Sequence, residues 1–109
     1  MSGDYILKRS GEQFMFNLRA GNYQVILTSQ RYASKASAQQ GIESVRKNSP
    51  ADERYNRLTA KNGSFYFTLS AANGEIIGNS EMYTTATARD NGIDSVKANG
   101  PTAVVKDET

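Results

Sequence analysis

The sequence predicts an α+β fold of two tandem repeats, packed together as one pseudo-twofold domain. Each repeat is expected to be an antiparallel β-meander of about three strands followed by one α-helix. Residues 14–50 align with residues 65–101 without a gap, and 14 of the 37 aligned pairs are identical. In each copy, apolar residues first alternate with period two and then recur at helical spacing. Because a unit of about 50 residues buries too little surface to be stable alone, we expect the copies to share a core.

The repeat sets the expected boundaries. All 109 residues are predicted to form a single domain, residues 1–109. Repeat one covers residues 3–51, repeat two covers residues 54–102, and residues 103–109 form a C-terminal tail. In the tail, Val104 and Val105 are apolar enough to dock, whereas the polar residues 106–109 are expected to fray.

Short apolar runs predict the strands. Tyr5–Lys8 is expected to be the first strand, and Phe14–Arg19 alternates as a half-buried strand should. Val25–Thr28 is rich in β-branched residues and is predicted to be the third strand. In repeat two, the corresponding strands are expected at Tyr55–Thr59, 65–70 and Ile76–Asn79.

The turn between the second and third strands is predicted to differ between the copies. Repeat two has Asn73 and Gly74, a pair that accepts positive φ and is a strong hairpin signal. In repeat one, Tyr23 stands at the position of Gly74, and the nearest glycine, Gly21, lies earlier. We therefore expect a different type of turn in repeat one.

Each repeat is predicted to end in a helix. Ser34 and Thr85 can cap the first turns with their hydroxyl groups, and Asn48 and Asn99, each followed by a proline, mark the ends. Apolar residues three apart form a narrow stripe on each helix: Ile42 and Val45, Ile93 and Val96.

A glycine interrupts each predicted helix at the same position, Gly41 and Gly92. Glycine costs about 1 kcal/mol relative to alanine inside a helix, so a shared exception needs a shared reason. Close approach of the helix to the sheet or to the other helix is the favoured explanation. A backbone contact with a ligand is the alternative.

Composition excludes several chemistries. The chain has no cysteine, histidine or tryptophan, which removes disulfides, thiol nucleophiles, Ser-His and Cys-His dyads and the usual zinc ligand sets. The acidic residues are dispersed; Glu43 and Asp94 occupy equivalent helix positions, where a solvated helix face is favoured over a paired site. Carboxylates alone could still form a calcium or magnesium site. Because the acids are dispersed, we expect a non-enzymatic protein with no cofactor and no metal.

The same composition suits a water-soluble cytoplasmic protein. The mean hydropathy is −0.60, and no segment approaches the roughly 20 apolar residues of a membrane span. The N-terminal residues show no basic segment followed by an apolar one, so no signal peptide is expected. The absence of cysteine fits a reducing cytoplasm.

Charge is unevenly distributed between the copies. Residues 1–51 carry a net charge of +4 and residues 52–109 a net charge of −2. Repeat one is therefore the candidate for binding an anion. A nucleic-acid surface on the outward sheet face would use stacking and phosphate contacts. Its candidate residues are Arg9, Arg19, Arg31 and Tyr66, beside Met15.

Two tyrosines, Tyr32 and Tyr83, repeat in the loops before the helices. The favoured interpretation is an aromatic plug that packs the incoming chain against the first turns of each helix. The alternative is that both tyrosines line a groove between the repeats, where a small molecule could bind.

A resemblance to a known family rests on the turn of repeat two and on two motifs present in both copies. These are Asn73-Gly74-Glu75, then Ser80-Glu81-x-Tyr83 with Ser29-Gln30-x-Tyr32, and Gly92-Ile93-x-Ser95-Val96-x-x-Asn99 with Gly41-Ile42-Glu43-Ser44-Val45-x-x-Asn48. With these residues the chain resembles the YegP-like family of small bacterial proteins over essentially its whole length. The chain departs from the repeat pattern at Tyr23 and at Leu27, which stands opposite Gly78 in the alignment.

The resemblance implies an α+β fold with a meander and a helix in each repeat. It also implies that single-copy relatives pair to build what this chain builds internally. It implies no function and no catalytic or ligand-binding residues, because the family is uncharacterised.

The function is thus unknown from sequence, and three classes are weighed. The leading expectation is a small non-enzymatic interaction or accessory module of the bacterial cytoplasm, monomeric, with a protein as a possible partner. Weak nucleic-acid binding through the sheet face of repeat one is the alternative. A small-molecule binder or enzyme at the inter-repeat groove is the third class.

Overall fold

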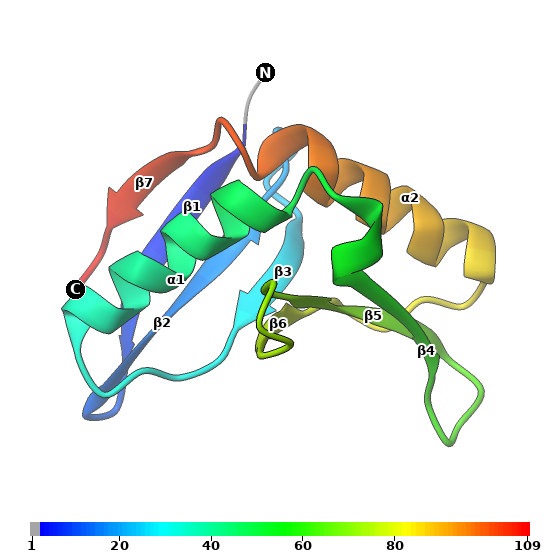
Figure 1. Cartoon of the computed structure of the whole chain (residues 1–109), viewed down its shortest axis with the longest axis horizontal. Coiled ribbons are helices and arrows are strands. Elements are labelled where there is room, and N and C mark those ends of the chain that lie inside the picture. The colour runs from blue at the N-terminus through cyan, green and yellow to red at the C-terminus, as the bar shows by residue number, and fades with distance from the viewer. Residues whose placement is uncertain (1–2) are drawn as a thin grey trace.

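The computed structural model describes residues 3–109, which form one seven-stranded sheet and two α-helices (Figure 1). In chain order the elements are β1 (Asp4–Ser10), β2 (Gln13–Arg19), β3 (Val25–Ser29), α1 (Lys35–Asn48), the 3-10 helix η1 (Asp52–Arg54), β4 (Tyr55–Thr59), β5 (Phe65–Ser70), β6 (Ile76–Asn79), α2 (Ala86–Asn99) and β7 (Val104–Asp107). The predicted class, α+β with two tandem repeats, is confirmed.

The two meanders join edge to edge into one sheet with the strand order β4-β5-β6-β3-β2-β1-β7. The seam is the antiparallel pair β3–β6, in which Thr28 lies opposite Asn79 and Ser29 opposite Gly78. A Cβ atom at Gly78 would lie 2.6 Å from the carbonyl oxygen of Thr28. The difference between Leu27 and Gly78 therefore follows from packing at the seam, where Leu27 leaves no room for a second side chain.

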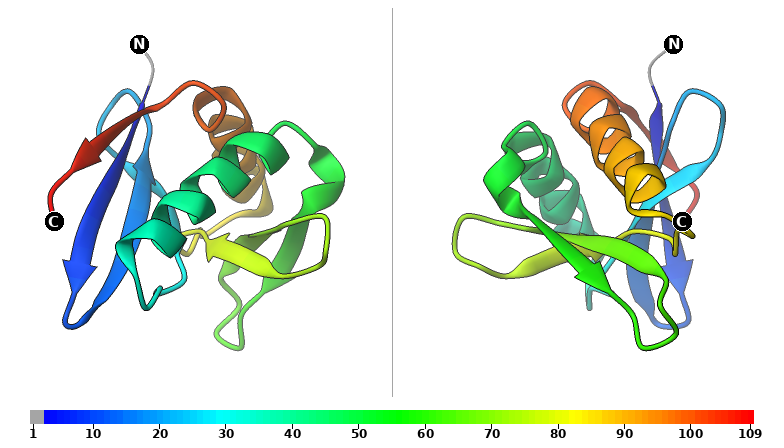
Figure 2. Two further views of the ribbon diagram at one scale, coloured as in Figure 1. Left: turned by 60° about the vertical axis from the view of Figure 1, so that its left-hand side comes forward. Right: turned by 90° about the vertical axis from the view of Figure 1, so that its right-hand side faces the viewer.

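Both helices lie on one face of the sheet and cover a core drawn from both repeats (Figure 2). The alternation predicted for the second strands is confirmed, since Phe16 and Leu18 in β2 are fully buried, as are Phe67 and Leu69 in β5. The predicted helix stripes face the same core: Ile42, Val45, Ile93 and Val96.

The predicted helix boundaries are also confirmed. The Ser34 hydroxyl accepts a hydrogen bond from the Ser37 amide at 3.1 Å, and the Thr85 hydroxyl accepts one from the Ala88 amide at 3.0 Å. The helices end at Asn48 and Asn99. The two copies thus use the same local signals to start and stop the helix.

A tyrosine of each repeat donates a hydrogen bond to the C-terminal end of the other repeat's helix. The Tyr5 hydroxyl donates to the carbonyl oxygen of Gly100 at 2.6 Å, and the Tyr55 hydroxyl donates to that of Ser49 at 2.7 Å. Both carbonyls follow the last turn of a helix, where backbone acceptors lack helical partners. The two contacts are equivalent, so the pseudo-twofold arrangement is fixed by hydrogen bonds as well as by apolar packing.

The expectation of two different turn types is wrong. In repeat one, the Tyr23 amide donates to Ala20 and the Ala20 amide to Gln24; Gly74 and Ala71 make the same two bonds in repeat two. Tyr23 adopts a φ of 67°, close to the 87° of Gly74. The Arg19 guanidinium lies 5.2 Å from the Tyr23 ring, a contact that helps to hold a non-glycine residue in the left-handed region.

The tail is ordered further than predicted. Docking of Val104 and Val105 is confirmed, but Lys106 and Asp107 belong to β7 and are not frayed. Strand β7 pairs in parallel with β1, and Asp107 forms an ion pair with Lys35 of α1 at 2.5 Å. Pairing with β1 and the ion pair with Lys35 hold these polar residues in place. Both partners lie far away in the sequence, so the local pattern of the tail did not predict its order.

The helices described in residues 3–109 are too short and too polar to cross a membrane.

Candidate interaction surface

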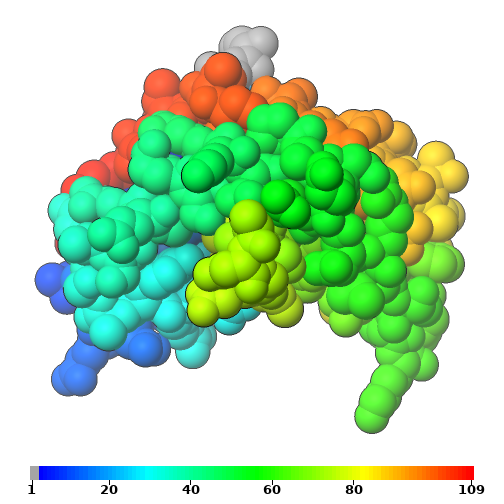
Figure 3. All heavy atoms as spheres, in the orientation of Figure 1, coloured from blue at the N-terminus to red at the C-terminus, as the bar shows by residue number. Residues whose placement is uncertain are grey.

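The face of the sheet opposite the helices, here called the open face, has no covering element among residues 3–109 (Figure 2). In the space-filling view, which sees this face edge-on, the tips of the β1–β2 and β4–β5 hairpins project on either side, and the lower outline of the molecule between them is concave (Figure 3). A broad sheet surface without a covering layer is where this fold can contact another molecule.

A row of polar side chains crosses the middle of the open face. Cross-strand pairing aligns one residue from each of five strands in the order Asn17, Thr28, Asn79, Thr68, Asn56. The Asn17 amide donates to the Thr28 hydroxyl at 3.0 Å, and the Asn56 amide donates to the Thr68 hydroxyl at 2.9 Å. Asn17 and Thr68 are buried, so the uncharged hydrogen-bonding groups that the row exposes are mainly those of Asn56 and Asn79.

Beside the polar row, repeat one carries a basic triplet, Lys8–Met15–Arg31. Lys8 pairs with Met15 across β1 and β2. The bridge between Phe14 and Tyr32 places Arg31 beside Met15 on the other side, and both residues line one shallow depression. Two cations thus flank an apolar side chain.

The equivalent positions of repeat two carry an apolar triplet, Leu58–Tyr66–Met82. Leu58 pairs with Tyr66 across β4 and β5, and the bridge between Phe65 and Tyr83 places Met82 beside Tyr66. Leu58 is 37% exposed and Met82 is 57% exposed. The two repeats therefore share one scaffold but differ at this part of the open face, which is basic in repeat one and apolar in repeat two.

Three charged side chains, those of Arg19, Asp4 and Lys106, cluster at the β1 side of the open face. The Arg19 guanidinium donates two hydrogen bonds to the Asp4 carboxylate, at 2.7 and 2.9 Å, and Lys106 lies 3.1 Å from the same carboxylate. The hydrogen bond from Arg19, followed by that from Lys106, lowers the pKa of Asp4 below its usual value. Asp4 thus neutralises part of the charge of Arg19.

The lowered pKa of Asp4 predicts a loss of stability in acid. Its contribution is complete above the unfolded-state pKa of about 3.9 and disappears as the pH falls through the lower folded-state value. We expect the free energy of unfolding of the protein to fall more steeply below about pH 4 than that of Asp4→Asn, which lacks this titration. Urea unfolding at several pH values measures both slopes, and equal slopes would contradict the prediction.

The residues predicted to bind nucleic acid are only partly together. Arg31 lies beside Met15 on the open face, and Tyr66 lies on the same face in the other repeat. Arg19 also lies there, but it is bonded to Asp4. Arg9 shares the helix-side face with Phe14, whose ring is 5.0 Å from its guanidinium, so Arg9 cannot join the others.

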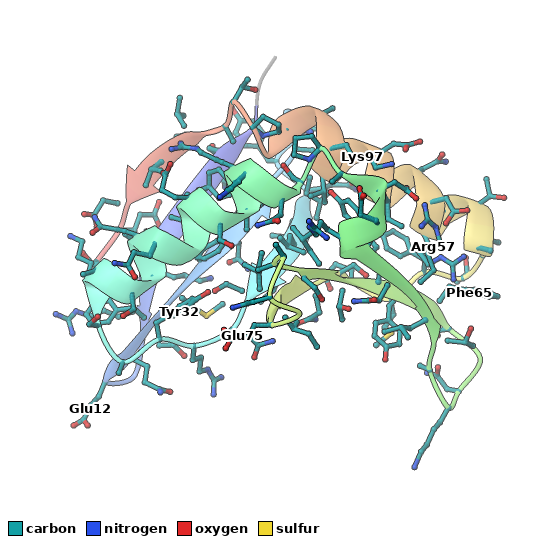
Figure 4. All side chains as sticks on the ribbon, viewed as in Figure 1. Glu12, Tyr32, Arg57, Phe65, Glu75 and Lys97 are labelled. Atoms are coloured by element: carbon teal, nitrogen blue, oxygen red, sulfur yellow. The ribbon has the colours of Figure 1, made fainter. Side chains whose placement is uncertain are left out.

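The two repeated tyrosines lie in separate places. Tyr32 stacks on Phe16 with ring centroids 6.3 Å apart, and burial raises its pKa. It also lines a groove of about 490 Å³ between α1 and the β5–β6 turn, where Glu75 lies (Figure 4). Tyr83 lines another groove, of about 300 Å³, with Gln24 and Glu81. Each tyrosine therefore both packs against its repeat and borders an inter-repeat groove, but they do not share one groove.

The two equivalent helix acids also lie apart from any cluster. Glu43 forms an ion pair with Arg46 on its own helix at 2.6 Å, and Asp94 is exposed on α2. Within residues 3–109, no three side chains of the kinds that bind metals gather closely enough to hold an ion. The open face of the sheet is therefore the stronger candidate for an interaction surface.

Sequence reasoning missed three residues of the open face: Lys8, Leu58 and Met82. The gapless alignment pairs Met82 with Arg31, but it pairs Leu58 with Leu7 and so hides the equivalence of Leu58 and Lys8. The structure shows that Lys8 and Leu58 both face the second strand at equivalent positions. Allowing one extra residue in the hairpin of repeat two would have revealed the pair.

Comparison with known proteins now gives the family. The model of a domain of unknown function, DUF1508, matches twice, at residues 10–56 and 60–107. A UPF0339 protein of Bordetella pertussis is 66% identical over 109 residues, which cover 100% of this chain and 98% of the relative. The chain belongs to the UPF0339 (DUF1508) family. The YegP protein of Escherichia coli K12, also named a UPF0339 protein, is 57% identical, with both chains covered completely.

Solved structures of the UPF0339 family share this architecture. The solution structure of YegP from Escherichia coli matches with a TM-score of 0.94 at 57% identity, covering 100% of this chain and 95% of that chain. A UPF0339 protein of Shewanella oneidensis matches with a TM-score of 0.92 at 55% identity, covering 98% and 92%. The Escherichia coli protein is described as having unknown function. The expected membership in the YegP-like family is confirmed, and no function of the family is established.

Proposed function

We propose that this protein is a non-enzymatic, monomeric binding module of the bacterial cytoplasm that takes a protein partner on the open face of its sheet. The observation that carries the proposal is the apolar triplet Leu58–Tyr66–Met82 on a sheet face that no element of residues 3–109 covers, with Leu58 and Met82 exposed and Tyr66 half-buried between them. Aromatic residues and methionine are enriched at protein interfaces, where lysine and acidic residues are depleted.

The difference between the two copies supports this proposal. Positions that build the scaffold agree between the repeats, whereas the basic triplet and the apolar triplet differ at every position. Burying apolar surface contributes about 25 cal/mol per Å². A partner that covers the apolar triplet would gain this energy, and the neighbouring polar row would supply hydrogen bonds that fix its orientation.

Nucleic acid is the second candidate, favoured by the basic triplet Lys8–Met15–Arg31. Its two cations could contact phosphates, and Tyr66 could stack on a base. The support is weaker because Arg19 is engaged by Asp4 and Arg9 lies on the other face of the sheet. Such binding would weaken steeply with salt, since phosphate contacts release counterions.

Affinity capture from a lysate of the bacterium that carries the gene separates the two candidates. We expect the double variant Tyr66→Ala, Met82→Ala to lose the captured protein, because it removes the centre of the apolar triplet. The matched variant Met15→Ala, Arg31→Ala should retain it. Nuclease treatment should leave the capture unchanged. Both variants alter surface positions, so stability should change by no more than about 0.5 kcal/mol per substitution, as urea unfolding would show.

Three results would contradict the protein-partner proposal. Capture that nuclease abolishes, or that depends on Arg31 and not on Tyr66, would favour nucleic acid. A partner that both double variants retain would bind elsewhere on the molecule. Turnover of a small molecule that a single substitution in the Tyr32 groove abolishes would make the protein an enzyme.

A further inference from the structure

The two outer strands of the repeats, β1 and β4, differ in what lies beside them. Strand β1 is covered by β7, which pairs with it in parallel over Asp4–Leu7. Strand β4 is the other edge of the sheet, and no strand of residues 3–109 pairs with its outer side. Four of its five residues are exposed. By the internal symmetry of the protein, the outer side of β4 corresponds to the site that β7 fills. The 3-10 helix η1 occupies the beginning of this site, because the Tyr55 amide donates to the Asp52 carbonyl, and the part beside Arg57 and Thr59 is empty.

From Arg57 onward, the backbone of β4 presents the same unpaired groups that β1 offers to β7. Leu7 and Arg57 are equivalent, because they lie opposite Phe16 and Phe67 respectively. The Leu7 carbonyl faces away from β2 and accepts a hydrogen bond from the Glu108 amide at 2.7 Å. The amide and carbonyl of Arg57 must likewise face away from β5, toward the empty side. An extended chain placed there would form main-chain bonds like those of β7.

The helix beside the empty site differs in charge from the helix beside β7. Val105 of β7 lies in a groove of about 590 Å³ with Gln39, Ile42 and Glu43 of α1. The equivalent positions on α2 are Asp90, Ile93 and Asp94, so the repeat-two site keeps the apolar residue and replaces a glutamine by a second acid.

The repeat-two site also lacks a lysine that the repeat-one site has. Lys35, which binds Asp107 of β7, is equivalent to Ala86 on α2. Asp94 is exposed and has no ion-pair partner among residues 3–109. Asp90 is already bonded to Arg89 at 3.1 Å and lies 3.4 Å from Arg57. A chain that occupies the β4 edge would therefore meet the unpaired carboxylate of Asp94, with no lysine at the start of the helix. It fits best with a basic side chain directed toward α2.

The side chain of Arg57 does not supply that charge to an incoming strand. Its guanidinium is bonded to Asp52 at 3.0 Å and lies 3.4 Å from Asp90. Asp52 also binds Lys97 at 2.7 Å. Arg57 is thus held by acids on η1 and α2. It would also oppose pairing of β4 with the β4 strand of a second copy centred on this residue, because like charges would lie opposite each other.

We propose that the outer edge of β4 binds an extended segment of a partner protein, which runs parallel to β4 and directs a lysine or arginine toward Asp94. The segment extends the sheet to eight strands in the way that β7 extends it on the other edge. This site is separate from the open face and does not depend on the function proposed there.

A peptide made from the chain's own tail tests the proposal. The probe has the sequence of residues 105–109, acetylated at its N-terminus so that it begins beyond η1, with the substitution Val105→Lys, which places the lysine where Val105 lies in β7. In amide NMR spectra of the full chain, adding the probe up to about 5 mM should move the signals of Arg57 and Thr59 saturably. The same peptide with Val105→Glu should bind at least about threefold more weakly, because it would place an acid beside the unpaired carboxylate of Asp94.

Matched variants separate main-chain pairing from charge. Proline is tolerated at edge-strand positions whose N–H faces outward, so Arg57→Pro should fold and should bind the lysine probe about two- to tenfold more weakly than Arg57→Ala, which keeps the N–H. Asp94→Asn should also weaken binding, whereas Glu43→Gln, at the equivalent position of α1, should not. If Arg57→Pro fails to fold, the comparison of Asp94→Asn with Glu43→Gln still tests whether the probe binds beside α2.

The proposal has clear contrary results. It is overturned if the probe moves no β4 signal, if the lysine and glutamate peptides bind equally, or if Asp94→Asn and Glu43→Gln behave alike. Signals of Arg57 and Thr59 that shift with protein concentration in the absence of peptide would show a second copy on this edge, and would overturn the assigned occupant.

Discussion

Replacing Tyr55 with alanine should lower the free energy of unfolding by about 3–5 kcal/mol, the usual cost of deleting a large buried side chain. Tyr55 is 6% exposed, and its ring packs edge-on against Phe67 with centroids 5.7 Å apart. Its hydroxyl reaches the Ser49 carbonyl at the end of the other repeat's helix. The substitution therefore removes core volume and a cross-repeat hydrogen bond together.

Conservative variants separate the two contributions. Tyr55→Phe keeps the ring and leaves the buried Ser49 carbonyl without its donor, which should cost about 1–3 kcal/mol. Tyr5→Phe should cost a similar amount, because Tyr5 makes the equivalent bond to Gly100. Urea unfolding followed by circular dichroism gives these values. Tyr23→Phe is the control, since Tyr23 is 64% exposed and should change stability by less than about 0.5 kcal/mol. Equal effects at Tyr55 and Tyr23 would show that the bond to Ser49 contributes nothing.

The importance of these tyrosines could not be read from the gapless repeat. An offset of 51 aligns Tyr5 with Asn56, whereas the structure makes Tyr5 equivalent to Tyr55, because the second hairpin is one residue longer. Strands, helix ends and core residues depend on local patterns, and these were predicted. The helix-end contacts depend on which repeat each helix covers, and no local pattern contains that information.

Two further errors have the same kind of cause. Tyr23 at positive φ is disfavoured by local preference, but its surroundings override that preference. The order of Lys106 and Asp107 depends on β1 and on Lys35, both distant in sequence. The open face was foreseen as a surface, but its apolar triplet and the empty edge of β4 emerge only when the two repeats are compared residue by residue in space.

Alanine at Gly41 should destabilise the protein by about 1–3 kcal/mol, although alanine favours a helix by about 1 kcal/mol over glycine. A Cβ atom at this position would collide with the Tyr32 hydroxyl, lie 2.8 Å from Cζ of the same ring, and lie 3.0 Å from Cε2 of Phe16. Close approach, the favoured explanation for the helix glycines, is thus what the structure shows. A Cβ atom at Gly92 would collide with the Tyr83 hydroxyl in the same way, so Gly92→Ala should destabilise the protein by a similar amount.

A double-mutant cycle identifies the contact responsible. Tyr32→Phe removes the oxygen that the new Cβ would strike, so the Gly41→Ala, Tyr32→Phe variant should recover part of the stability, with a coupling of at least about 0.5 kcal/mol. Gln40→Ala, at an exposed position one residue earlier, is the control and should be nearly neutral. Chemical denaturation of the four cycle members measures the coupling. If Gly41→Ala instead stabilised the protein by about 1 kcal/mol, helix propensity would outweigh the contact. The repeated glycines would then require another reason, and the alternative of a ligand at the helix backbone would regain support.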